Sequence, residues 1–191
     1  MISFDFGAVL AEWPLLAKGV GVTVALTAVS ATVGVALGVA CAWSRLYGAA
    51  WLRAIVGTYV ELIRNTPFIV QLFFVFFGLP GLGVKLSAES ASVLAMVINL
   101  GAYACEIVRA GIATTPRGQI EAALSLALSK VQIFLRVVLP PALRKVWPAL
   151  VSQIIIVMLG SAVCGQISTE ELSYAATVSY THLTLPTIYS V

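Results

Sequence analysis

Long apolar runs, separated by short polar segments, form the main pattern of this chain. Residues 20–42, for example, contain no Asp, Glu, Lys or Arg. A helix needs about 20 predominantly apolar residues to cross the hydrocarbon core of a bilayer. The pattern therefore predicts an all-α integral membrane protein with four spans, at residues 20–43, 67–84, 88–108 and 146–167.

The segment 49–64, between the first two spans, has a different pattern. Its polar side chains Arg53, Glu61 and Arg64 share one helical face with Gly57, and apolar side chains occupy the rest. This amphipathic pattern predicts a helix that lies in the membrane interface. A tilted extension of a span is the alternative.

The loop at residues 109–145 has structure of its own. Thr115 and Pro116 suit the N-cap and the first turn of a helix, and an apolar stripe then follows at Ile120, Ala123, Leu124, Ala127 and Leu128. The spacing predicts a short amphipathic helix. Pro140 and Pro141 predict a turn before the last span. The exposed stripe must be buried against the bilayer, the chain's own helices or a soluble partner.

The basic residues set the expected orientation. Nine of the eleven lie in two regions, which four crossings place on the same side of the membrane: Arg45, Arg53, Arg64, Arg109, Arg117, Lys130, Arg136, Arg144 and Lys145. Cytoplasmic loops are enriched in Lys and Arg. We therefore expect both regions in the cytoplasm and the N-terminus outside.

Composition and chemistry narrow the function. The chain is 60% apolar and 10% charged, with a mean hydropathy of +1.02, which disfavours soluble and nucleic-acid-binding proteins. The single His182 and the single Asp5 form no catalytic set, and the three cysteines lack metal-site spacing. We expect no enzyme activity, no cofactor and no metal. Any ATP must be hydrolysed by another polypeptide, since no phosphate-binding loop is visible.

A more specific pattern lies in the loop. Glu121-Ala122-Ala123, then Ala127, then Val137-Val138-Leu139-Pro140 resembles the signature loop of permeases from binding-protein-dependent ABC importers. That family usually has glycine at the position of Ala127. Two further strings, residues 61–67 and 102–112, are similar to the polar amino-acid subfamily, the histidine and glutamine type.

The resemblance implies a type I importer fold, here with four of the usual five core spans, an interfacial helix and a cytoplasmic coupling helix at residues 118–130. It implies a bacterial inner-membrane location and three partners: cytoplasmic ABC ATPase subunits, a second permease that is identical or a paralogue, and an extracytoplasmic substrate-binding protein. The residues it assigns to coupling with the ATPase are Gly118, Glu121, Ala122, Ala123 and Ala127. Alternatively, the loop helix folds onto the bilayer or the chain's own spans, with Glu121 capping its first turn.

Polar side chains within the spans are candidates for a translocation path, because each costs free energy in hydrocarbon unless it is paired or faces a cavity. The candidates are Gln71, Asn99, Glu106 and Gln153. Glu106 can instead pair with Arg109, one turn away, and an amide can instead join two helices. Gly34 and Gly38 form a small-xxx-small pair that lets another helix approach closely.

Two departures from the family pattern bear on function. Residues 159–162 lack the lysine and the acidic or amide residue common in the subfamily, which leaves the substrate's charge open. After Ala176 the composition changes, so we expect a permease domain at residues 1–176 and an artefactual or native short tail at 177–191.

Two other functions are alternatives to the importer permease. One is an ATP-independent secondary transporter or channel, and the other is a membrane scaffold.

Overall fold

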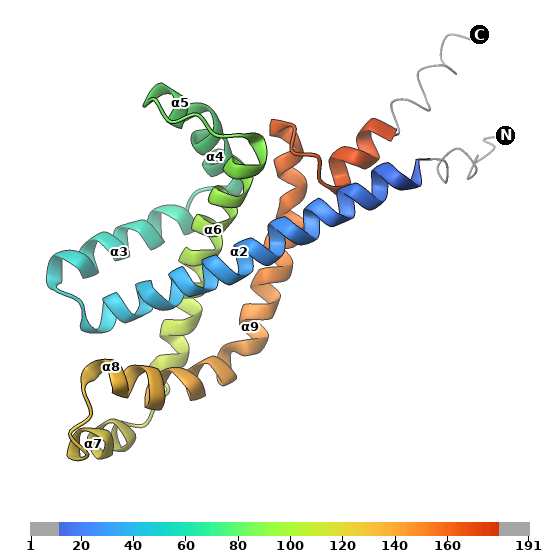
Figure 1. The fold of residues 1–191 in the computed structure, drawn as a ribbon. Coiled ribbons are helices and arrows are strands. Elements are labelled where there is room, and N and C mark those ends of the chain that lie inside the picture. Colours follow the sequence, from blue (N-terminus) through green and yellow to red (C-terminus); the bar gives the residue numbers. More distant parts are fainter. Residues whose placement is uncertain (1–11, 180–191) are drawn as a thin grey trace, which may run out of the picture.

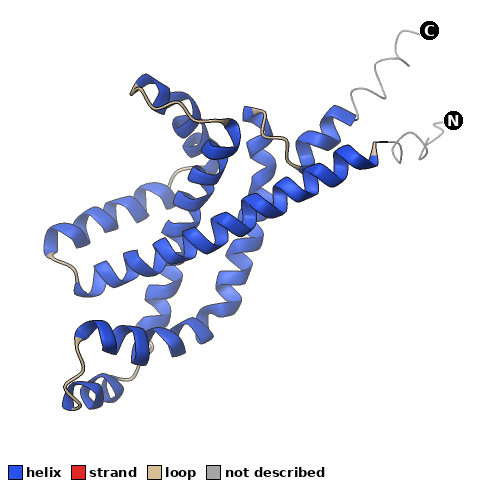
Figure 2. Cartoon of the chain, in the orientation of Figure 1, coloured by secondary structure: helices blue, strands red, loops and turns tan. Residues whose placement is uncertain are grey.

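The computed structural model describes residues 12–179, and its regular elements in this range are all helical (Figure 2). In chain order they are α2 (Trp13–Tyr47), α3 (Ala50–Arg64), α4 (Phe68–Phe73), the π-helix η1 (Phe74–Gly78), α5 (Leu79–Gly81), α6 (Ala88–Ile112), α7 (Arg117–Ser125), α8 (Lys130–Gln132), the π-helix η2 (Ile133–Val138), α9 (Leu139–Gly160) and the 3-10 helix η3 (Ser161–Ile167). Residues 172–179 form a last helix.

Three helical stretches are long and apolar enough to cross a membrane: α2, α6 and the continuous run Lys130–Ile167. They contain three of the four predicted spans. The predicted second span differs, because Ala50–Arg64 and Phe68–Gly81 form a helix pair bent by 112°. Pro67 has ψ 142° at the break, and its ring disfavours helical backbone in the preceding residue. A fourth crossing requires both arms of this bent pair. The predicted end of the second span at residue 84 was wrong, because the helix ends at Gly81.

The predicted turn at Pro140 and Pro141 was also wrong, since the chain is helical from Lys130 through both prolines. A proline ring clashes with the carbonyl four residues earlier in a regular α-helix. Those carbonyls, of Arg136 and Val137, lie in η2, where the wider π-turn accommodates them. The same arrangement recurs at Pro80, which follows η1. The chain therefore turns before Lys130, and it stays helical at the two prolines.

The contact between α2 and α6 organises the bundle (Figure 1). Gly34 and Gly38 lie where the two helices approach most closely: a Cβ on Gly38 would be 2.5 Å from the Cβ of Ala104. The small-xxx-small pair therefore packs against a helix of its own chain. Such close backbone approach is a usual source of stability between membrane helices.

The last described helix returns to the start of α2. The Leu172 N–H donates to Thr23 Oγ1 at 3.1 Å, and Lys18 pairs with Glu170. Both ends of the described chain thus lie at the same end of the bundle (Figure 1). Residues 180–191, most of the predicted tail, lie outside the described range, so the division at Ala176 stays a prediction.

Candidate functional site

The predicted coupling helix is present as α7 but is shorter than expected. It begins at Arg117, one residue before the predicted start, and ends at Ser125 instead of residue 130. Its N-cap is Pro116, whereas the pattern indicated Thr115. Its end is a Schellman motif: the Ala127 N–H donates to Leu124 O at 2.9 Å, and the Leu128 N–H donates to Ala123 O at 3.2 Å. These bonds close the helix before Ser129.

Ala127 explains this early end. Its φ is 56°, in the left-handed region that residues with a Cβ adopt at a cost of roughly 1–2 kcal/mol. This is the position at which a Schellman motif normally uses glycine. A new capping box then starts the next helix, in which Ser129 and Gln132 exchange bonds between side chain and backbone.

The two sides of α7 have different environments. Ala123 is only 4% exposed and packs in one core cluster with Ile133 and Phe134 of η2, while Ile120 and Leu128 pack against that cluster. The sequence left three possible covers for this apolar stripe, and for these three residues the cover is the chain's own helices. Leu124 and Ala127 of that stripe remain exposed.

The opposite side of α7 is an exposed face of small residues with one carboxylate, formed by Gly118, Glu121, Ala122 and Ser125. The spacing i, i+3, i+4, i+7 puts them on one face of the helix. We call these four residues the α7 face. Glu121 makes no ion pair within residues 12–179, and Leu126, 75% exposed, lies just beyond the helix end. The sequence analysis did not include Ser125 or Leu126 among the candidate docking residues. The helical spacing of Ser125 from Gly118, Glu121 and Ala122 could have indicated it.

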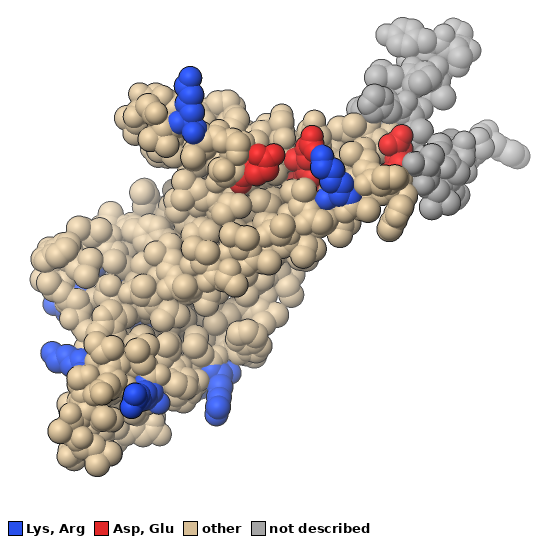
Figure 3. Space-filling view, viewed as in Figure 1, with Lys and Arg blue, Asp and Glu red and all other residues tan. Residues whose placement is uncertain are grey.

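Basic side chains predominate at one end of the molecule. On the face drawn in Figure 3, most Lys and Arg side chains lie over the end that carries α7 and α8, whereas the acidic side chains gather toward the start of α2, where further basic side chains also lie. The aromatic side chains Trp43 and Phe134, with ring centroids 4.7 Å apart, pack beside the basic end. A docking partner for α7 would therefore meet a basic surface with an exposed carboxylate.

Gln71 and Asn99 are brought together within the bundle. Gln71 Nε2 donates to Ile63 O and Thr66 O, both at 2.8 Å, which satisfies carbonyls at the bend between α3 and α4. Its Oε1 accepts from Asn99 Nδ2 at 3.0 Å. Gln71 therefore caps the bend and ties it to α6.

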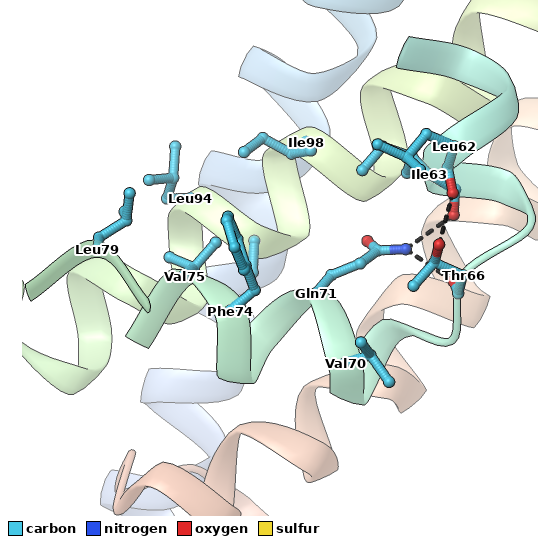
Figure 4. A pocket seen from close by; sticks show the side chains of 11 residues that line it. Leu62, Ile63, Thr66, Val70, Gln71, Phe74, Val75, Leu79, Leu94 and Ile98 are labelled. Carbon is cyan, nitrogen blue, oxygen red and sulfur yellow. Dashed lines mark hydrogen bonds between the residues drawn. The ribbon is translucent and has the colours of Figure 1, made fainter. Parts of the chain in front are cut away.

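A cavity with a volume of about 490 Å³ lies in the angle of the bent pair. Figure 4 shows Gln71 directed toward Ile63 and Thr66 rather than into open space. The lining is otherwise almost entirely apolar: Leu62, Ile63, Thr66, Val70, Gln71, Phe74, Val75, Leu79, Leu94, Ala95 and Ile98. Because an amino acid carries two charges that need polar partners, this cavity suits a polar solute poorly.

A smaller cavity, of about 100 Å³, has one of the predicted amides on its wall. It lies between α4, α6 and α9 and is lined by Phe68, Asn99, Ile156, Val157 and Gly160. The side-chain oxygen of Asn99, Oδ1, accepts no hydrogen bond from the described residues. Gln153 lies one turn before Val157, on the same side of α9, is half-buried and has no hydrogen-bond partner in the described range.

Glu106 lies apart from these amides, at the basic end. Arg109 Nη2 and Nε donate to its Oε2 at 2.7 and 3.0 Å, and Arg45 of α2 pairs with Oε1. The pair with Arg109 that the spacing allowed is therefore present. With both oxygens occupied, Glu106 joins the cytoplasm-facing ends expected for α2 and α6.

The bundle contains several helices long and apolar enough to cross a membrane, which defines the class of multi-span membrane proteins. Comparison with known proteins identifies the family. The family model described as "Binding-protein-dependent transport system inner membrane component" matches residues 34–186, and the chain belongs to this family. It is a membrane permease subunit of an ABC transporter, and its family consists of transport subunits, not enzymes.

Individual relatives agree with this assignment. The L-cystine transport system permease protein TcyB of Bacillus subtilis (strain 168) is 36% identical over 160 residues, which cover 84% of this chain and 68% of the relative. The arginine transport system permease protein ArtQ of the same strain is 34% identical over 163 residues, 85% of this chain and 74% of the relative.

A solved structure has the same fold. It is described as "Crystal structure of an amino acid ABC transporter with histidines", and it superposes with a TM-score of 0.83 at 31% identity, covering 98% of this chain and 92% of that chain. These matches favour the importer hypothesis over an ATP-independent channel or a scaffold.

Proposed function

We propose that this chain imports amino acids into the bacterial cytoplasm, with the α7 face docked on a separate ABC ATPase that hydrolyses the ATP. The observation that carries the proposal is the α7 face itself. Gly118, Ala122 and Ser125 permit close approach of another backbone, and a Cβ on Gly118 would meet nothing within 4 Å. Glu121 can accept a charge-assisted hydrogen bond from a basic residue of the partner.

The packing behind α7 supports a coupling role. Ala123 is held against Ile133 and Phe134 of η2, and η2 continues without a break into α9. Close-packed elements move together rather than deforming continuously. A displacement of α7 by the ATPase would therefore reach the spans through the run Lys130–Ile167. In this proposal Ala123 and Ala127 shape the docked helix, while Gly118, Glu121 and Ala122 touch the partner.

The proposed path runs along the junction of α4, α6 and α9. Asn99 and Gln153 provide amide groups with free hydrogen-bonding capacity on its walls, and Gln71 fixes Asn99 through the bend. Glu106 holds α2 and α6 together at the basic end. Opening between α6 and α9 would enlarge the 100 Å³ cavity into a passage for an amino acid.

The orientation in this proposal puts the basic end, with α7, in the cytoplasm and the N-terminus outside. A second permease subunit completes the path, and a substrate-binding protein delivers the solute at the opposite end. The substrate class rests on the relatives, whose names give cystine and arginine, and the amides of Asn99 and Gln153 suit the polar groups that all amino acids share.

Substitution of Glu121→Arg tests the docking. Reversing its charge should abolish co-purification of the ATPase subunits while membrane insertion continues, because repulsion replaces a charge-assisted bond. Glu89→Arg is the matched control, since it makes the same change at an exposed position at the far end of the bundle and should leave co-purification intact. Unchanged ATPase recovery with Glu121→Arg would refute the docking role.

A further inference from the structure

Gly160, the last residue of α9, is a glycine that the packing of this chain does not explain. Its backbone dihedrals, φ −63° and ψ −19°, are those of an ordinary right-handed helical residue. A Cβ built on it would meet no packed neighbour within 4 Å. A residue with a side chain would therefore fit here, and alanine would favour the helix more than glycine does.

Two other glycines of the bundle show the contrast. A Cβ on Gly38 would lie 2.5 Å from that of Ala104, and a Cβ on Gly101 would lie 2.7 Å from Leu37 Cδ2. Side chains at these positions would separate helices whose close approach stabilises the bundle. No contact of this kind is made at Gly160 within residues 12–179, so the chain's own packing leaves the space there open.

This space borders the cavity of about 100 Å³ between α4, α6 and α9, because Gly160 is one of the residues that line it. Ile156 and Val157 precede Gly160 by four and three residues, so the three share one face of α9. Phe68 of α4 and Asn99 of α6 complete the lining. A side chain at position 160 would therefore take up space beside the proposed path.

The lining also limits the charge of a solute. None of the five described residues that line the cavity is ionisable, and both carboxylate oxygens of Glu106 are already paired with arginines. The amides of Asn99 and Gln153 can pair with the ammonium and carboxylate groups that every amino acid carries. The solute's side chain is then left with apolar walls, where an ionised group would lose its hydration without a partner.

We propose that Gly160 is a specificity-determining residue, whose missing side chain makes room for the uncharged side chain of the transported amino acid. This inference rests on the importer function proposed above and adds the substrate class to it. A larger residue at position 160 would restrict the path to amino acids with smaller side chains.

Binding of free amino acids to the purified complex of the full chain with its ATPase and second permease subunits tests this role. Saturation-transfer NMR detects weak binding in the absence of the substrate-binding protein, whose own selectivity would mask that of the permease. Gly160→Leu should weaken the binding of L-glutamine about tenfold, because the added carbons overpack the occupied cavity. It should weaken the binding of the smaller L-alanine less than about threefold.

Two further variants accompany Gly160→Leu. Gly21→Leu is the matched control, because Gly21 is a helical residue of α2 with equally open surroundings and lies outside the cavity lining. It should leave the binding of both amino acids unchanged. Gly160→Ala adds a single methyl group, so it serves if leucine impairs folding, and it should weaken L-glutamine binding about threefold.

The charge of the solute is tested on the parent complex. L-Glutamate has nearly the same shape as L-glutamine but an ionised side chain, so it should bind at least about tenfold more weakly. Equal binding of these two amino acids would overturn the proposed substrate class.

Three results would overturn the role of Gly160. They are unchanged L-glutamine binding by both Gly160 variants, equal weakening of L-glutamine and L-alanine by Gly160→Leu, and loss of the second permease subunit from the Gly160→Leu complex. The last result would assign the open space to a helix of that subunit. A parent complex that binds none of the three amino acids would instead contradict the importer function on which the inference rests.

Discussion

Ala127 lies in a backbone conformation that favours glycine, with φ 56°. Its N–H closes the end of α7 on Leu124 O, so the strain is retained in the folded state by the Schellman motif. The family resemblance had indicated glycine at this position, and the structure supplies the physical reason. One methyl group therefore lowers the stability of the helix that we propose to dock on the ATPase.

Replacing Ala127→Gly should raise the midpoint of thermal unfolding of the purified chain, equivalent to a gain of about 0.5–1 kcal/mol. Relief of the left-handed strain exceeds the extra backbone entropy that glycine loses on folding. Ala122→Gly is the matched control, because Ala122 lies inside α7 and is exposed, and it should cost about 1 kcal/mol. Destabilisation by both substitutions would show that Ala127 is not strained.

At the scale of elements, the long apolar runs were sufficient to predict α2, α6 and the last span, because burial in lipid requires uninterrupted apolar helices. The bend between α3 and α4 was not predictable in detail, since it depends on Gln71 reaching back to carbonyls eight and five residues earlier. Continuation of the helix through Pro140 was missed because a π-turn has no sequence pattern of its own.

The candidate coupling site shows a different limit. Positions 120, 123, 124, 127 and 128 and positions 118, 121, 122 and 125 both have helical spacing, and both sets include small residues. Periodicity alone does not tell which set faces the chain's own core. The pairing of α7 with η2, a contact made only in the folded chain, decides that Ala123 is buried and Ala122 exposed.

Gln71 and Gln153 should respond differently to the same substitution. Gln71→Leu leaves Thr66 O without a donor and removes one of the donors to Ile63 O, so it should lower the free energy of unfolding by about 1–3 kcal/mol. Gln153→Leu removes no hydrogen bond and should change stability by less than about 0.5 kcal/mol.

Transport then separates the roles of the two amides. Gln153→Leu should reduce amino-acid uptake in reconstituted vesicles although the protein stays as stable as the parent chain, because it removes an amide from the wall of the path. Normal uptake by Gln153→Leu would exclude Gln153 from the path, and unchanged stability of Gln71→Leu would contradict its role at the bend.

At the scale of the whole molecule, packed helices connect the proposed docking face to the proposed path. The α7 face is exposed at the basic end, and the packing of Ala123 on η2 links it to α9, which lines the cavity beside Asn99. Glu106 joins α2 to α6 at the same end through Arg45. A movement applied at α7 therefore has a short, packed connection to the proposed path.

Labelling of a cysteine at Ser125 tests the account most directly, because Ser125 is exposed on the α7 face and the native Cys41, Cys105 and Cys164 are buried. The account predicts that a membrane-impermeant maleimide labels Ser125→Cys in inside-out vesicles but not in intact cells, and that added ATPase subunits block the reaction. Labelling from the outside of intact cells, or labelling that the ATPase leaves unchanged, would contradict it.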